Sequence, residues 1–288
     1  MARNREKKGS LNFQLKKLLD SKLAIGESKF EDKKQNLTFD KIYSWSTYRA
    51  YLQHGTYFLT WAKEKYGCTD LVAAKEYVNE WLKTREEQGL SAYTVKLETS
   101  AMMKIYNIDK DSIYKSKARL RANIERSRGE KVRDKHFSEK NNQELVRFCR
   151  ATGLRRAELS QIRGTDLIFI NDNPYLKVTR NTKGGRERVV PIILDQQFVV
   201  DLLKTKGAEK VFEKIPNSAD IHGYRAEFAT TLYKKLEKDI SILPKEKKYY
   251  CRKDLKGIVY DKDAMLEVSR ALGHNRIDVI AGHYIRKD

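Results

Sequence analysis

Cysteine is scarce in this chain, and its distribution argues against two of its common uses. The 288 residues contain three cysteines, Cys68, Cys149 and Cys251, and no Cys-x-x-Cys pair. An odd number of widely separated cysteines fits neither a disulfide framework nor a zinc site. We therefore expect free thiols in a reducing compartment, with no metal ligands among them, and place the protein in the cytoplasm.

Long apolar runs are also missing. No stretch approaches the roughly 20 apolar residues that a membrane-spanning helix needs. The first eight residues, Met-Ala-Arg-Asn-Arg-Glu-Lys-Lys, lack the apolar region of a signal peptide. The sequence thus predicts no membrane partner. Its 40% hydrophobic content is nevertheless enough for packed cores, and its length suits two domains.

Positive charge is in large excess. The chain has 59 Lys and Arg against 39 Asp and Glu, a net charge of +20 at pH 7. Such a surplus usually has a polyanionic partner, with nucleic acid first and an anionic membrane second. A basic protein without such a partner is the plainer alternative.

The excess is concentrated between residues 110 and 135, a stretch that contains ten basic and four acidic residues. We interpret this stretch as a basic helix and tether lying along DNA phosphates, because phosphates attract such patches regardless of sequence. The alternative is a solvated helix face with internal ion pairs. The candidate DNA contacts are Lys115, Lys117, Arg119, Arg121, Arg126, Arg128, Lys131 and Arg133.

Apolar spacing divides the chain into two parts. The first, 1–129, carries a basic N-terminal segment and reads as helices, among them Tyr48–Lys65, capped by Ser46 and Thr47, and Leu71–Gln88. Residues 130–137 are expected to form a linker, and 138–288 a second domain.

The second part adds β-structure to helices. Three β-rich segments, Leu167–Ile170, Tyr175–Val178 and Arg188–Ile192, are separated by turn sequences and predict a small antiparallel sheet. Within 238–262, two further segments could pair as a hairpin. The expected fold class is mainly α with a small antiparallel β-sheet.

Two arginines are candidates for binding a phosphodiester. Arg155 follows a Gly-Leu break at the start of a helix, and Arg225 lies three residues after His222, on the same face of a helical turn. Arginine suits this role because its planar fork donates two parallel hydrogen bonds and stays charged.

Other side chains could supply the proton transfers and the nucleophile. Lys183 lies at the tip of the predicted hairpin, ahead of two glycines, and could protonate a leaving oxygen. His222 and His274 can donate to phosphate oxygens or accept a proton near neutral pH. Tyr284 is the candidate nucleophile, although a phenol with a pKa near 10 needs activation.

The order and spacing of these pieces resemble the tyrosine recombinases, the phage-integrase family. Thr152-Gly-Leu-Arg-x-x-Glu-Leu159 resembles the first motif of the family. His222-x-x-Arg225, followed by Phe228-Ala-Thr, resembles the second motif, and Leu272-Gly-His274, followed by Tyr284, the third. The similarity covers roughly 138–284. The helical first part resembles the family's core-binding domain in size, position and character alone.

The resemblance implies a mechanism. Arg155 and Arg225 would clamp the scissile phosphate, and Lys183 would protonate the leaving 5′ oxygen with help from His222 and His274. Tyr284 would form a 3′-phosphotyrosyl bond, which requires neither cofactor nor metal. Glu158 would be a structural residue of the first motif.

The resemblance also implies partners. Four protomers would join two double-stranded DNA sites through a Holliday junction, and an accessory DNA-bending or excision factor could assist. The residue sequence at Asn275–Val279 and the insertion at 238–262 resemble those of mobile-element integrases, such as the integrase of a conjugative transposon. Such an enzyme would act on nucleoid DNA.

Three departures from the family pattern accompany this resemblance. His274 and Tyr284 are 284 − 274 = 10 positions apart, one more than the usual spacing, so a loop must absorb the extra residue. The 238–262 insertion could contact DNA or another protomer. Only Ile285–Asp288 follow the tyrosine, so protomers would use another element for assembly or the chain is shortened here.

Two other functions remain open. A type IB topoisomerase shares the chemistry but acts alone to relax supercoils, and a DNA-binding regulator could use the same fold without catalysis. Against the regulator, a protein that only binds DNA has no need of Tyr284.

Overall fold

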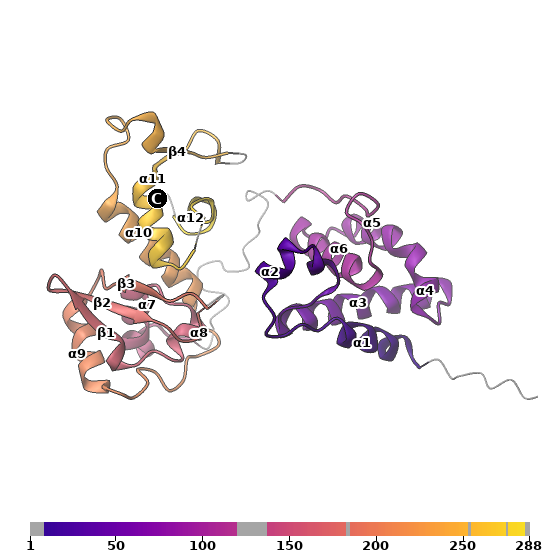
Figure 1. The fold of residues 1–288 in the computed structure, drawn as a ribbon, viewed down its shortest axis with the longest axis horizontal. Helices are drawn as coiled ribbons and strands as arrows, with labels where there is room; N and C mark the ends of the chain where they lie inside the picture. The colour runs from indigo at the N-terminus through magenta and orange to yellow at the C-terminus, as the bar shows by residue number, and fades with distance from the viewer. Residues whose placement is uncertain (1–8, 120–136, 183–184, 253–254, 275, 286–288) are drawn as a thin grey trace, which may run out of the picture. The chain divides into compact units, whose positions relative to one another are not determined.

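The computed structural model describes residues 9–119, 137–182, 185–252, 255–274 and 276–285. The chain divides into two compact units, Met1–Ile124 and Glu125–Asp288 (Figure 1), which we describe separately. Nearly all of the expected linker at 130–137 lies outside the described residues, as does the basic N-terminal segment at 1–8.

Helices make up the regular structure described in the first unit. In chain order they are α1 (Leu11–Ser21), α2 (Lys29–Lys34), η1 (Leu37–Asp40), α3 (Trp45–Tyr66), α4 (Leu71–Ala74), η2 (Lys75–Tyr77), α5 (Val78–Glu87) and α6 (Ala92–Tyr106). The core lies where α1 and α6 pack against α3 (Figure 1), and Phe58, Trp81 and Met102 are among its fully buried side chains.

Two helices of the first unit differ from the sequence prediction, one in its N-terminal cap and one in its continuity. Ser44, rather than Ser46 or Thr47, caps α3, because its hydroxyl accepts a hydrogen bond from the Thr47 backbone N–H at 3.2 Å. The expected single helix over Leu71–Gln88 is interrupted by the 3₁₀ turn η2, where the Tyr77 ring stacks on Tyr66.

The prediction of a helix in the basic stretch is wrong for the part that the structure describes. Residues 110–119 form turns and irregular chain, with Ile113 buried. The side chains of Asn79 and Glu86 accept hydrogen bonds from the backbone N–H groups of Tyr114 and Lys117, each at 2.8 Å. These tertiary hydrogen bonds replace the ones a helix would make.

The second unit combines helices with two small sheets. Its elements are η4 (Lys140–Asn142), α7 (Gln143–Thr152), α8 (Arg156–Leu159), η5 (Gly164–Asp166), β1 (Leu167–Ile170), β2 (Asn173–Val178), β3 (Arg188–Pro191), α9 (Gln196–Lys206), α10 (Ile221–Leu236), η6 (Lys245–Lys247), β4 (Lys248–Tyr250), β5 (Val259–Asp261), α11 (Lys262–Ala271) and α12 (Asp278–His283). The predicted fold class is therefore confirmed.

Both sheets are antiparallel. The larger has the order β1-β2-β3, with Leu176 opposite Leu167 on one side and Val190 on the other. The smaller pairs β4 with β5 inside the 238–262 insertion, as the sequence predicted. Asp261 ties this hairpin to the domain, since its buried carboxylate accepts from the N–H groups of Lys238, Asp263 and Ala264.

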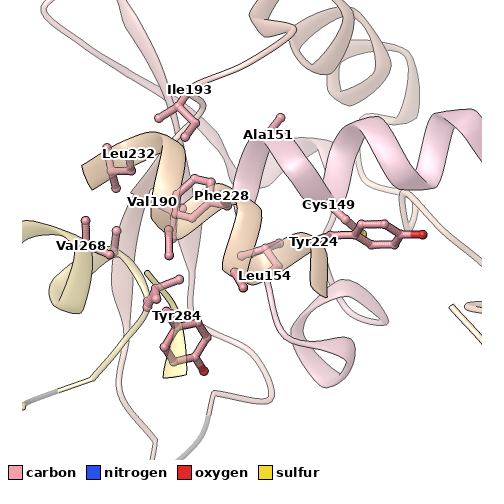
Figure 2. Packing of buried hydrophobic residues seen from close by; sticks show 14 of the residues in the cluster. Cys149, Ala151, Leu154, Val190, Ile193, Tyr224, Phe228, Leu232, Val268 and Tyr284 are labelled. Atoms are coloured by element: carbon pink, nitrogen blue, oxygen red, sulfur yellow. The ribbon is translucent and has the colours of Figure 1, made fainter. Parts of the chain in front are cut away.

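The core of the second unit lies around α7 and α10, which pack side by side. Figure 2 shows Phe228 and Leu232 on α10, with Val190 of β3 close to Phe228 and Ala151 on the neighbouring α7. No helix among the described residues is long and apolar enough to cross a membrane.

Gly153 fixes the exit of the chain from α7. Its φ of +57° lies in the left-handed region, and a Cβ atom built on it would lie 2.4 Å from Cδ1 of Phe228. Only glycine meets both demands, because it has no side chain to strain or to clash. The Gly-Leu break predicted before Arg155 is confirmed, with Gly153 ending α7.

We predict that Gly153→Ala destabilises the second unit by about 2–5 kcal/mol, the sum of left-handed strain and overpacking. Urea unfolding of the full chain would measure it. Gly67→Ala is the matched control: Gly67 has φ +65° with nothing within 4 Å of the added Cβ, so only about 1–2 kcal/mol should be lost in the first unit. Equal losses at both sites would contradict the steric account.

Candidate active site

The C-terminal end of α11 is the centre around which the candidate site is built. Gly273 has a φ of +65°, and the backbone N–H groups of Gly273 and His274 bond back to the carbonyls of Arg270 and Ser269, each at 2.8 Å. This pair of bonds is a Schellman motif, which ends the helix. The turn places His274 directly after the helix end.

Carbonyl groups at this helix end bind three arginines from distant segments. Arg155 donates from Nη2 to the Leu272 carbonyl at 2.8 Å, and Arg225 donates to the same oxygen from its own Nη2. The Nε of Arg188 donates to the carbonyl of Ala271 at 2.8 Å. A helix C-terminus carries partial negative charge, so it is suited to holding cations together.

Glu158 joins two of these arginines. Its buried carboxylate accepts from Nη1 of Arg155 at 2.8 Å and from Nη1 and Nη2 of Arg188 at 2.8 and 2.7 Å. It also accepts from the backbone N–H of Arg155 at 2.7 Å, which fixes the start of α8. Burial alone raises the pKa of Glu158, but hydrogen bonds and charge from Arg188 and Arg155 outweigh it and hold the pKa at about 2.

Arg225 is the most deeply buried of the three arginines, with 1% of its surface exposed. Its Nη1 donates to the carbonyl of Gly153 and its Nε to the hydroxyl of Tyr284, at 3.4 Å for the latter. Within the described part of the chain, no carboxylate pairs with it. Burial lowers the pKa of Arg225 to about 10; Tyr284 opposes this decrease and Arg155 adds to it.

Tyr284 brings its hydroxyl to this group of cations. The hydroxyl lies 3.2 Å from Nε2 of His274 and 3.4 Å from Nε of Arg225. Figure 2 shows the ring at the edge of the labelled apolar cluster, with the hydroxyl directed away from it. The backbone carbonyl of Tyr284 accepts from the hydroxyl of Thr230 at 3.3 Å, which ties the end of α12 to α10.

The structure thus gathers four of the six predicted site residues into direct contact: Arg155, Arg225, His274 and Tyr284. His222 lies close by, in the first turn of α10, with its ring centroid 6.3 Å from that of Tyr284. Lys183 lies outside the described residues, on the connection between Val178 of β2 and Arg188 of β3. Its catalytic role stays a prediction.

The candidate DNA contacts are only partly described. Lys115, Lys117 and Arg119 are exposed, and the Arg119 guanidinium lies 5.6 Å from the ring centroid of Tyr93. The remaining candidates, Arg121, Arg126, Arg128, Lys131 and Arg133, lie outside the described residues.

Sequence reasoning missed Arg188. It falls within a predicted strand and outside the motifs, yet it contributes one of the three guanidinium groups of the site. The alternation of β3 held a signal: Val189 is exposed and Val190 is buried, so Arg188 lies on the same side of the strand as Val190. An arginine that faces inward must have its N–H groups satisfied there, and Arg188 donates them to the carboxylate of Glu158 and the carbonyl of Ala271.

Among the described residues, no three His, Cys, Asp or Glu side chains lie close enough together to bind a metal ion. The three cysteines are buried and form no disulfide with one another. Arginines, histidines and a phenol are the groups that this site offers to a ligand, and together they suit an oxyanion.

Comparison with solved structures finds similar recombinases. XerH site-specific recombinase bound to a palindromic difH substrate, in a post-cleavage complex, aligns over 96% of this chain and 91% of its own, with 16% identity and a TM-score of 0.51. Tn1549 transposon integrase in complex with circular intermediate DNA aligns over 97% and 96%, with 12% identity and a TM-score of 0.47. No protein-family model and no curated protein sequence matches the chain.

The chain therefore has the fold of the tyrosine recombinases, as its motifs predicted. At this level of sequence identity the similarity establishes the fold alone, so the activity is argued from the site.

Protonation of Glu158 at low pH should lower the unfolding free energy of the protein. The pKa of this carboxyl is lowered from 4.5 to about 2 on folding, so its stabilising effect is complete above about pH 4.5 and is lost as the pH falls towards 2. We predict that Glu158→Gln unfolds more easily at neutral pH. Between pH 4.5 and 2, the unfolding free energy of the wild type should fall by about 3 kcal/mol more than that of the variant.

Urea unfolding across this pH range is the measurement, and Glu209→Gln, on the exposed surface, is the control that should keep the wild-type slope. Parallel pH profiles for the wild type and Glu158→Gln would show that the carboxyl is not held ionised by the two arginines.

Proposed function

We propose that this protein is a site-specific DNA recombinase that cuts and rejoins strands through a 3′-phosphotyrosyl intermediate. The observation that carries the proposal is the pairing of Arg225 with Tyr284: a buried guanidinium without a carboxylate partner among the described residues, beside a phenol hydroxyl. A buried cation held by carbonyls and a phenol is poorly compensated. A phosphodiester entering the site would supply the missing negative charge.

In the proposed reaction, the oxygen of Tyr284 attacks the scissile phosphorus while its proton passes to His274, whose Nε2 lies 3.2 Å away. Arg155 and Arg225 hold the non-bridging oxygens, where negative charge builds up in the transition state. The phosphorus–O5′ bond breaks, and the departing 5′ oxygen takes a proton from Lys183. His222 assists in binding the phosphate.

Rejoining reverses these steps with a different strand. A 5′ hydroxyl attacks the phosphotyrosine, and Tyr284 leaves and regains its proton, so the energy of the broken bond is conserved in the link. We infer that four protomers carry out paired exchanges through a Holliday junction on double-stranded DNA in the cytoplasm, in the integration or excision of a mobile element. An accessory DNA-bending factor could favour one direction.

We predict that Tyr284→Phe abolishes covalent attachment to DNA, because the ring is kept while the attacking oxygen is lost. The substrate would be a pool of nicked duplexes with random sequence, incubated with protein in EDTA. Adducts that survive denaturing electrophoresis would be recovered and sequenced, and the selected duplex would then be tested singly.

Tyr175→Phe, a substitution of a tyrosine on β2 away from the site, should form adducts at the wild-type rate. Adducts that persist in Tyr284→Phe would rule out this nucleophile. Relaxation of plasmids that lack the selected sequence would instead indicate a topoisomerase, and tight binding without any adduct would indicate a regulator.

Binding to the selected duplex should weaken steeply with salt, with a log–log slope of about −0.9 for each phosphate contact. We predict that alanine at Lys115, Lys117 and Arg119 together makes this slope shallower by up to ~2.7. Electrophoretic mobility shifts between 50 and 200 mM salt would measure the change.

The matched control removes three positive charges from the same unit, at Lys16, Lys34 and Lys65, which pair with neighbouring acids. This control should keep the slope. An equal change in both triple variants would show that net charge, rather than contact by these residues, sets the salt dependence.

A further inference from the structure

We propose that Arg188 is a positioning residue for the phosphate clamp, acting on Arg155 through Glu158. This inference rests on the proposed function and extends it to a residue outside the motifs that suggested the activity. Arg188 makes no contact with Tyr284 among the described interactions, so its effect must pass through its neighbours.

The guanidinium of Arg188 is held on three sides. Two N–H groups form a bidentate pair with the carboxylate of Glu158, at 2.8 and 2.7 Å, and Nε donates to the Ala271 carbonyl at 2.8 Å. The side chain is 7% exposed. A fork held by three bonds in a buried site has a single orientation, which fixes the orientation of Glu158 as well.

Glu158 in turn orients Arg155. The same Oε1 atom that accepts from Arg188 accepts from Nη1 of Arg155, also at 2.8 Å. The three side chains therefore form a guanidinium–carboxylate–guanidinium bridge, in which the position of Arg155 depends on a carboxylate anchored from its other side.

Charge balance gives Arg188 a second effect. Arg155, Arg188 and Arg225 bring three positive charges to the site, and Glu158 brings one negative charge. With Arg188 present, the carboxylate is shared between two cations and leaves Arg155 able to bind a phosphate oxygen. If Arg188 were absent, Glu158 would pair with Arg155 alone and compete with the substrate for it.

Arg188 also packs on the turn that places His274. A Cβ atom added to Gly273 would lie 3.1 Å from Cδ of Arg188, so the alkyl part of the side chain covers the glycine at the end of α11. The first and third sequence motifs are thus joined through a residue that belongs to neither.

Substituting Arg188 with lysine tests whether its charge or its hydrogen-bonding geometry matters. Arg188→Lys keeps a positive charge near Glu158 but cannot form the bidentate pair and bind the Ala271 carbonyl at the same time. We expect single-turnover adduct formation on the selected duplex to slow on the order of 10²-fold, because a small displacement of a catalytic group has this effect. Affinity for the duplex and the urea midpoint should stay close to wild type.

A double-mutant cycle with Arg155→Lys distinguishes positioning from a general structural role. If Arg188 acts through Arg155, then Arg188→Lys should cause little further slowing once Arg155 is already lysine. Arg147→Lys, which disrupts an ion pair with Asp195 away from the site, is the control that should leave the rate unchanged. Additive losses in the cycle, or a wild-type rate in Arg188→Lys, would overturn the inference.

A second variant covers the case in which Arg188→Lys does not fold. Glu158→Asp keeps the charge but is too short to bridge both arginines, so it should reproduce the slowing and the same non-additivity with Arg155→Lys. If the wild type forms adducts and neither variant slows, only the role of Arg188 fails. If the wild type forms no adduct on any duplex in the pool, the proposed function fails with it.

Discussion

The hydrogen bonds from three arginines to the end of α11 are the interaction on which the rest of the site depends. Arg155, Arg188 and Arg225 come from separate segments, and their charges repel one another. The carbonyls of Ala271 and Leu272 bring them together, because a helix C-terminus offers oxygen atoms that have no donors within the helix. Gly273 makes this possible, since its left-handed conformation ends the helix there.

This arrangement concentrates three guanidinium groups at the end of α11, which suits it to the anion binding that the proposed function requires. Among the residues that the structure describes, only Glu158 forms ion pairs with these guanidinium groups, and it pairs with Arg155 and Arg188 rather than with Arg225. Such a cluster costs stability in the free protein, and the surrounding core must offset that cost. Under the proposed mechanism, these donors would need little reorganisation when negative charge develops on the bound phosphate.

The sequence predicted those features whose causes are local. The three-stranded sheet, the stop at Gly153 and the hairpin of the insertion follow from turn residues and alternation. Motif spacing singled out Arg155, Arg225, His274 and Tyr284, which lie together in the structure; their catalytic roles stay predictions. The place of Arg188 in the site could not be predicted, because its partners, Glu158 and Ala271, lie 30 and 83 positions away in the sequence. The irregular course of residues 110–119 could not be predicted either, because it depends on hydrogen bonds to side chains of α5, which are distant in the sequence.

The spacing between His274 and Tyr284 shows how packing can override a count of residues. An extra residue would turn a continuous helix by ~100°, yet the two side chains still meet at 3.2 Å. They do so because α11 ends at Ala271 and α12 begins only at Asp278, so the connection absorbs the difference. Ile280 and Ala281 bury one face of α12 in the core, and that burial fixes where the tyrosine hydroxyl lies once the connection has absorbed the extra residue.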